Sequence, residues 1–279
     1  MRLRPAALLG ALVSAAGLAP LQAHAATQPA SPALQQLLSA SPVEGSSSGQ
    51  ISYVRQQALK MAADVLGAQT GFADRCSQIE GILKKDAPRL DAAYPFNALM
   101  MGVGVLPPVI VETRDNIALD ERVMRVADRT YQIVHAPRFV AMPPTWRNYL
   151  FLGLSTDRPA LPTDAAQLPQ NALERAYWKS EVQRAYAHGV DQANSVFRSD
   201  LARLKRDYSG MRLFYDLYAR GMVTAPVVAS TSDVVRRDGP GVISMGDTTF
   251  RITVQPSFVT KPSRWNPIAP LDKSPADAE

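Results

Sequence analysis

Cysteine and histidine, two residue types that often act as nucleophile and base, are scarce in this chain. The chain has a single cysteine, Cys76, and three histidines, His24, His135 and His188. Cys76 beside His135 or His188 could form a thiol–imidazole dyad, in which the imidazole activates the thiol as a nucleophile. The residues around Cys76 are ordinary helix-surface types, and a lone cysteine usually acts as a small buried hydrophobe. We therefore expect Cys76 to be structural.

No metal site or cofactor loop follows from the spacing of residues. Glu181 is too far from His188 to form the helical zinc motif, and no second histidine lies nearby. Gly102-Val103-Gly104 lacks the third glycine and the following helix of a dinucleotide-binding loop. Neither a nucleophile elbow nor a Walker-type loop occurs. The sequence thus predicts no bound metal and no cofactor.

Paired carboxylates are the remaining candidates for catalysis. Asp120 and Glu121 are adjacent, and Asp86 lies close to Asp91 in the sequence. Two carboxylates held across a cleft can hydrolyse a glycosidic bond. A periplasmic peptidoglycan hydrolase that uses dispersed carboxylates is therefore one open hypothesis. The sequence places no pair in a cleft, and we favour a protein that is not an enzyme.

The first residues are typical of a secretory signal peptide. Arg2 and Arg4 precede an apolar stretch from Ala6 to Leu18, and Ala23-His24-Ala25 offers small residues to a signal peptidase. We predict a signal peptide over residues 1–25. No later stretch has the roughly eighteen consecutive apolar residues of a transmembrane helix. No cysteine lies at the predicted cleavage site, so the sequence shows no lipobox cysteine there.

Charge and composition divide the rest of the chain. The formal net charge of +5 is small and spread along the sequence, so direct binding of nucleic acid is not expected. Residues 26–50 are rich in Ala, Ser, Pro and Gln and predict a flexible leader, in which Leu34, Leu37 and Leu38 could form one docking turn. We predict an α+β domain over residues 51–260 and a loose tail over residues 261–279.

Apolar periodicity predicts that helices dominate this domain. Apolar residues three or four apart predict a helix from Tyr53 to Leu83, in which Gly67 and Gly71 allow either close packing or a bend. Its predicted buried stripe includes Ala58, Met61 or Ala62, Val65, Ile79, Ile82 and Leu83. Residues 90–101 are also expected to be helical. The stripe over residues 174–222 predicts one long helix, or two helices broken near Ser209-Gly210.

Strands are expected in three places. Pro107 and Pro108 exclude a central strand, which leaves an extended edge or a strand after the prolines. Residues 122–134 predict two short strands around Asp128-Arg129, and residues 249–255 alternate like a strand. We expect residues 103–135 and 249–255 to form one small, mostly antiparallel sheet that the long helix covers. The predicted fold class is therefore a helix-dominated α+β domain.

Two segments on either side of a proline-rich bend combine arginine and aromatic residues with rigid turns. They are Arg125 to Tyr131 and Pro143 to Leu150. Arginine and aromatic side chains are enriched at protein–protein interfaces and supply much of their binding energy. We predict that residues from these segments and from the preceding proline pair contact a partner, and the alternative is that they are ordinary core and rim residues. The predicted interface residues are Pro107, Pro108, Arg129, Trp146, Arg147 and Tyr149.

An ordered set of short motifs resembles the DotC family of type IVB secretion and IncI-like conjugation systems. The resemblance extends from Ile51 to Trp265, and each motif is weak by itself whereas their order is specific. The motifs lie at residues 67–73, 90–91, 96–99, 105–109, 125–131, 143–150, 189–194, 207–211 and 251–253.

The resemblance implies a non-enzymatic subunit of the core complex that spans the cell envelope. It implies a periplasmic location at the outer membrane, where we expect this subunit to be held by its partners. The implied partners are DotD-like and DotH-like subunits and further copies of the chain in a ring. DotC-like proteins are typically lipoproteins, so the lack of a lipobox cysteine departs from the family.

A periplasmic ligand-binding protein is a third hypothesis, which the helix-rich pattern disfavours.

Overall fold

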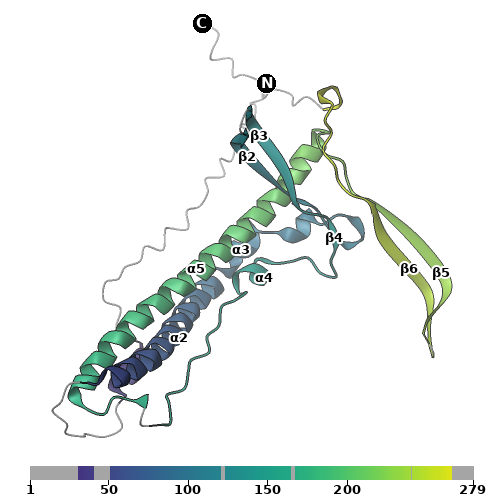
Figure 1. The fold of residues 1–279 in the computed structure, drawn as a ribbon. Helices are drawn as coiled ribbons and strands as arrows, with labels where there is room; N and C mark the ends of the chain where they lie inside the picture. Colours follow the sequence, from purple (N-terminus) through teal and green to yellow (C-terminus); the bar gives the residue numbers. More distant parts are fainter. Residues whose placement is uncertain (1–30, 41–50, 121–122, 165–166, 240, 266–279) are drawn as a thin grey trace, which may run out of the picture.

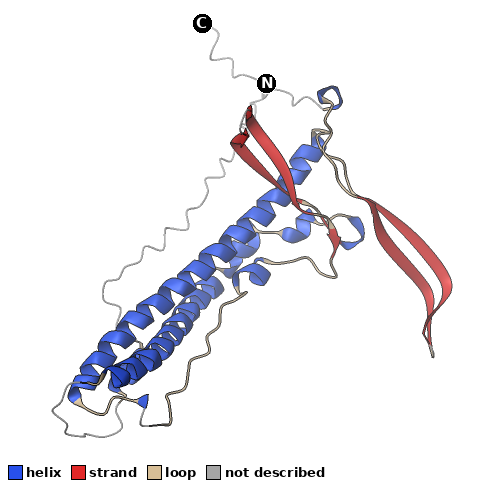
Figure 2. Cartoon of the chain, in the orientation of Figure 1, coloured by secondary structure: helices blue, strands red, loops and turns tan. Residues whose placement is uncertain are grey.

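The computed structural model describes residues 31–40, 51–120, 123–164, 167–239 and 241–265. Its body is a pair of long helices, and two β-ribbons extend from one end of that body (Figures 1 and 2). The predicted signal peptide and residues 266–279 of the predicted tail lie outside the described residues. Among the described residues, no helix combines the length and the apolar character needed to span a bilayer.

The two long helices are α2 (Tyr53–Lys85) and α5 (Ala172–Ala219), which lie side by side. Arg55 contacts Glu174 near the start of both helices, and Arg75 contacts Asn194 further along both, so the helices run parallel. At about 1.5 Å per residue, the 48 residues of α5 extend roughly 70 Å. The helix is continuous at Ser209-Gly210, so the break considered there does not occur.

Glycines bring α2 and α5 into close contact. A Cβ atom added to Gly189 would lie 2.0 Å from the carbonyl oxygen of Ala68, and one added to Gly71 would lie 2.2 Å from that of Tyr186. Both distances are far below van der Waals contact. The predicted role of Gly67 and Gly71 in close helix packing is thereby confirmed.

The first half of α2 buries a different face from the predicted one. Leu59, Ala63 and Leu66 are buried, whereas Met61 and Val65 are exposed. The buried face meets both α5 and the short helix α1 (Pro32–Ser39), whose Leu37 carbonyl accepts a 2.9 Å hydrogen bond from the indole of Trp178. The docking turn predicted at Leu34, Leu37 and Leu38 is thus part of a helix.

The chain between α2 and α5 returns through short elements. The predicted helix over residues 90–101 is wrong, because the chain leaves the helical path at Tyr94-Pro95. A two-stranded sheet, β1 with β4, and the one-and-a-half-turn helix α4 follow. The bounds are α3 (Ala87–Ala93), η1 (Phe96–Leu99), η2 (Gly102–Gly104), β1 (Val105–Leu106), β4 (Arg138–Phe139) and α4 (Trp146–Leu150).

The first ribbon consists of β2 (Val109–Asp120) and β3 (Val123–His135). Strand β2 begins directly after Pro107-Pro108, which confirms the strand expected after the prolines. The two short strands predicted around Asp128-Arg129 are wrong, because both residues lie inside β3 and Arg129 pairs with Arg114. The base of the ribbon packs on α5, where Gly210 leaves room for the backbone and side chains of β2.

The second ribbon consists of β5 (Val227–Gly239) and β6 (Val242–Val254), and the 3-10 turn η4 (Pro262–Arg264) follows it. The single sheet expected from residues 103–135 and 249–255 is wrong, because the described strands form three separate two-stranded sheets. All three are antiparallel. The helix-dominated α+β fold class is confirmed.

Candidate interaction surface

The segment that begins with Pro143 places Trp146 at a junction of short elements. Helix α4 starts with a capping box, in which the Asn148 side chain accepts a 2.8 Å hydrogen bond from the Thr145 amide. Trp146 is 1% exposed, and its indole N–H donates to Asp91 at 2.7 Å. Arg147 donates to the same carboxylate at 2.7 Å and lies 4.3 Å above the indole ring. Both hydrogen bonds lower the pKa of Asp91, and the one from Arg147 has the larger effect.

Tyr149 is held by the same packing. Its ring stacks on Phe96 with 5.6 Å between centroids. Burial, together with the charge of the Asp207 carboxylate and a hydrogen bond to it, raises the pKa of Tyr149 to about 12. The phenol therefore stays protonated and acts as a hydrogen-bond donor that joins α4 to α5.

The six predicted interface residues fall into two groups. Four of them are buried within this chain: Pro107, Pro108, Trp146 and Tyr149. The two arginines are exposed, with Arg147 in α4 and Arg129 halfway along β3. A hydrogen bond with Tyr131 and the nearby charge of Glu112 raise the pKa of Arg129. The partner interface stays a prediction, in which the arginines could contact a partner directly.

A groove lies beside α4, with a volume of about 840 Å³. Six of its lining residues are aromatic or proline, and Asp91, Asn97, Arg138, Thr145 and Asn148 add polar groups. Among the described residues, Arg138 has no ion pair. The walls include Tyr94, Pro95, Phe96, Pro143, Pro144 and Trp146.

The candidates for chemistry are not brought together. Cys76 is buried, which raises the pKa of its thiol, and no hydrogen bond within the described residues joins it to His135 or His188. His135 lies 3.1 Å from the guanidinium of Arg206 instead. Among the described residues, no three His, Cys, Asp or Glu side chains form a group that could hold a metal ion.

The carboxylate pairs have separate surroundings. Asp91 accepts hydrogen bonds from α4, whereas Asp86 lies 3.7 Å from Arg89 on the next turn. Asp120 ends β2, and Glu121 lies outside the described residues. Neither Asp86 nor Asp120 lines the groove beside α4.

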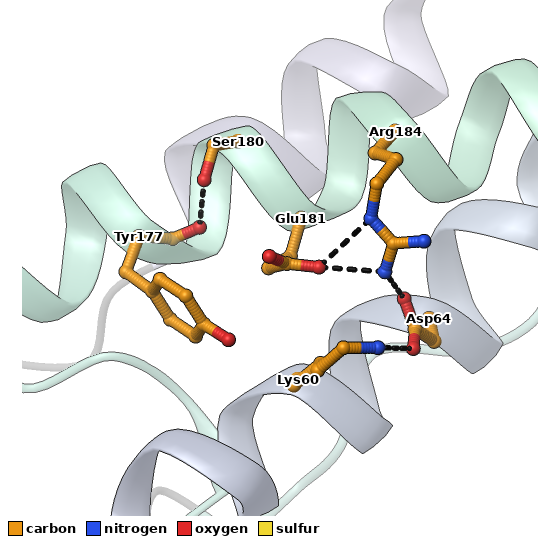
Figure 3. A network of polar contacts seen from close by, with 6 residues as sticks. All are labelled: Lys60, Asp64, Tyr177, Ser180, Glu181 and Arg184. Carbon is orange, nitrogen blue, oxygen red and sulfur yellow. Dashed lines mark hydrogen bonds and ion pairs between the residues drawn. The ribbon is translucent and has the colours of Figure 1, made fainter.

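A chain of ion pairs crosses between α2 and α5 on the surface (Figure 3). Asp64 accepts from Lys60 and from Arg184, each at 2.6 Å, and Arg184 also contacts Glu181 at 2.6 Å. Such exposed pairs contribute little to stability, and the Arg184–Asp64 pair joins the two long helices. The network is therefore part of the scaffold.

Sequence reasoning missed Asp74, which is buried on α2. Its carboxylate accepts hydrogen bonds from Arg158 at 2.9 Å and from Tyr186 at 3.1 Å, and also from Ser31 at the start of α1. One carboxylate thus joins α1, α2, α5 and the returning loop. The signal in the sequence that could have revealed this buried carboxylate was an aspartate placed among apolar residues at helical spacing.

Sequence reasoning also missed β5 and the full length of both ribbons. The available signal for β5–β6 was the turn sequence Asp238-Gly239-Pro240-Gly241, which is flanked by β-branched residues. The ribbons expose large apolar side chains that no described part of the chain covers. These include Ile117, Met124 and Val126 on the first ribbon and Val234, Val235 and Met245 on the second.

A comparison with protein families shows the kind of system to which this protein belongs. A family model described as "Type IV secretory system, conjugal DNA-protein transfer" matches residues 53–267, well over half of the chain. The chain belongs to this family. The matched range of the conjugal-transfer family begins at the first residue of α2 and includes α5, both ribbons and all six predicted interface residues.

Membership of the conjugal-transfer family makes the protein a component of a type IV secretion or conjugation system. This part of the resemblance to DotC is confirmed, whereas the assignment to DotC itself stays a prediction. No curated protein matches the chain.

Proposed function

We propose that the protein is a structural, non-catalytic subunit of the core complex of a type IVB secretion or conjugation system. The observation that carries the proposal is the exposure of apolar side chains on two ribbons that extend from a well-packed helical body. Exposed apolar groups on projecting elements are typical of surfaces that a partner covers. Membership of the type IV secretory family supplies the setting.

The proposed partners are DotD-like and DotH-like subunits and further copies of this chain. The ordered motifs that resemble DotC support this choice, and the predicted signal peptide supports a periplasmic site. In the proposed arrangement, the subunit is held at the outer membrane by its partners. The roughly 70 Å helix α5 would give the assembly a rigid strut, with the ribbons available at one end.

A structural role is also supported by how the polar residues are used. Asp91, Asp74 and Tyr149 each hold short elements or loops against the helix pair. Catalytic acids and bases must be free to exchange protons with a substrate, and these groups are engaged in folding contacts.

Deletion of the gene tests this function in a strain that carries the transfer system. We expect transfer of DNA or protein to be abolished and to be restored by the wild-type gene. DotD-like and DotH-like subunits should co-purify with the tagged chain, and the purified chain should leave peptidoglycan intact in a zymogram. Unchanged transfer together with no co-purifying subunits would contradict the proposal, and clearing of the zymogram would favour a hydrolase.

A further inference from the structure

The groove beside α4 has the composition of a site for an extended, proline-rich segment. Its volume of about 840 Å³ is within the range of roughly 300–1,000 Å³ that is typical of binding sites. Phe96 and Trp146 give it buried walls, Pro143 and Pro144 are partly exposed, and Met142 is 79% exposed. Grooves lined by aromatic residues bind proline-rich segments in the polyproline II conformation.

Polar groups of the groove suit both the backbone of such a segment and an acidic side chain beside it. A polyproline II helix makes no internal hydrogen bonds, so its carbonyl oxygens need donors. The hydroxyl of Tyr94 and the side-chain amide of Asn97 can donate to them. Asp91 already accepts hydrogen bonds from α4, whereas Arg138 has no ion pair among the described residues. Arg138 therefore leaves a positive charge for an acidic residue that follows the prolines.

Residues 267–272 of this chain, which we call the proline segment, have the matching sequence. They read Pro-Ile-Ala-Pro-Leu-Asp. In a polyproline II helix, which has three residues per turn, Pro267 and Pro270 would lie on the same side. Asp272 follows two residues later and supplies the acidic group. Residues 266–279 contain three acidic residues and one lysine, so their charge also complements that of Arg138.

The proline segment lies too far along the chain from its own groove for both prolines to enter it. Trp265 follows η4, which lies past the end of α5 (Figure 1), and its indole donates to the Val259 carbonyl at 2.8 Å. Tyr94 of the groove packs on Tyr208, eleven residues and about 16 Å before the end of α5. Pro267 is two residues from Trp265, a reach of at most about 7 Å. A groove on another copy is free of this restriction.

We propose that the proline segment of one copy binds the groove beside α4 of a second copy. Pro267 and Pro270 then contact the aromatic and proline walls, and Asp272 lies beside Arg138. Such a contact joins two different surfaces, so it is head-to-tail and can close into a ring. It identifies how copies meet in the homo-oligomer of the proposed function, and rests on that function only for its place in the cell.

A labelled peptide of residues 264–275, added to the purified full chain, tests this contact by fluorescence anisotropy. We expect saturable binding to the wild-type chain. The peptide with Pro267→Ala and Pro270→Ala should bind at least about tenfold more weakly, because it lacks the groups that fill the groove. No saturable binding, or equal binding of the two peptides, would overturn the proposal.

A charge exchange tests the position of Asp272. Arg138→Glu in the full chain should weaken binding of the wild-type peptide by about tenfold, because two carboxylates then meet. The peptide with Asp272→Arg should restore binding to that variant. Arg212→Glu is the matched control, since it makes the same change at an exposed position of α5 outside the groove, and should leave binding unchanged. A folded Arg138→Glu chain that binds both peptides like the wild type would contradict the pairing.

The apolar wall has a matched pair of its own. Met142→Ser should weaken binding of the peptide several-fold, because Met142 lines the groove. Met61→Ser changes an exposed methionine on α2 and should have no effect. Circular dichroism and thermal unfolding establish that each variant folds.

Sedimentation velocity of the full chain distinguishes a second copy from the same copy. The wild-type chain should self-associate, and Pro267→Ala with Pro270→Ala in the full chain should weaken self-association at least about tenfold. A wild-type chain that binds the peptide but stays monomeric as its concentration rises would overturn the contact between copies.

The transfer assay separates this contact from the proposed function. If gene deletion abolishes transfer while the peptide does not bind, the contact is wrong and the structural role stands. If deletion leaves transfer intact while the peptide and the variants behave as expected, the contact stands and the proposed function is wrong.

Discussion

The helix pair and the ribbons use their side chains in opposite ways. Between α2 and α5, Trp178, Val182 and Ala193 are completely buried, and glycine backbones touch the opposite helix. On the second ribbon, Val234 is 84% exposed and no described residue covers it. Packing of the first kind stabilises a single chain, whereas exposure of the second kind costs stability until a partner covers it. The helix pair is therefore the region that stabilises the folded chain, and the ribbons are the region that we expect to bind a partner.

The ribbons are nevertheless anchored where they meet the body. Val109 and Ile110 of β2 pack over Gly210 on α5. The second ribbon is joined at its base by the hydrogen bond from the Val259 amide to the Met222 carbonyl, 2.8 Å long. A two-stranded ribbon is marginally stable by itself in water, so these anchors and later contacts with partners must both contribute.

The largest expected effect is the loss of Trp146, which tests whether the predicted interface belongs to the packed part. Trp146→Ala should lower the free energy of unfolding by about 3–5 kcal/mol, because it leaves a cavity and removes a donor from Asp91. Urea denaturation followed by circular dichroism measures this. Arg147→Ala, on the exposed neighbour, is the control and should change stability little. A stable Trp146→Ala chain that no longer assembles would instead make Trp146 an interface residue.

A second expected loss concerns the contact between the helices. Gly189→Ala should destabilise the chain by about 1–3 kcal/mol or more, because the new methyl group collides with the Ala68 carbonyl. Gly81→Ala is the matched control, since it lies in α2 with nothing within 4 Å. That substitution should stabilise by up to about 1 kcal/mol through helix propensity. Equal effects at the two positions would mean that the close approach of α2 and α5 is absent in solution.

The sequence predicts the packed part better than the exposed part, for a physical reason. The long helices follow from apolar spacing because their burial depends on that spacing. Even so, the predicted face of α2 is displaced in its first half. Leu59 and Ala63 face α1 and α5, whereas Met61 and Val65 form a second apolar stripe that stays exposed. Periodicity finds a helix with two such stripes but does not tell which of them is buried.

The full length and the pairing of the ribbon strands escaped sequence reasoning because no core imposes alternation on them. β5 carries Ser, Thr and Asp among its valines and is solvated on both sides, so its pattern is weak. The pairing of Arg114 with Arg129 depends on cross-strand register, which places them opposite each other although they are far apart in sequence. Trp146 and Arg147 were recognised by residue type, but the burial of one and exposure of the other depend on the position of Asp91.

A smaller effect is expected at Asp200, a buried carboxylate on α5 with one oxygen that lacks a hydrogen bond. Burial raises the pKa of Asp200, and the nearby Arg203 only partly opposes this. Because the folded chain holds the proton more tightly than the unfolded chain, stability falls as pH rises from the ordinary aspartate pKa through the raised one. The Asp200→Asn substitution removes this pH dependence. The stability of the variant relative to wild type should therefore increase as pH rises from acid to neutral.

Urea unfolding of Asp200→Asn and wild type at a series of pH values measures that difference. Asp191→Asn, at an exposed position of the same helix, is the control and should give a difference that does not vary in this way. A stability difference that stays constant from acid to neutral pH, or that shrinks, would contradict a raised pKa at Asp200.

The smallest expected effect comes from replacing a valine by threonine, once in the helix pair and once on the second ribbon. Val182→Thr places a hydroxyl in the buried contact between α2 and α5, and should cost about 1–2 kcal/mol. Val234→Thr makes the same change on the exposed ribbon, where threonine also suits a strand, and should change stability by less than about 0.5 kcal/mol. Thermal unfolding compares the two. Equal losses would show that the second ribbon is packed in the free chain, and the division between folding and binding regions would fail.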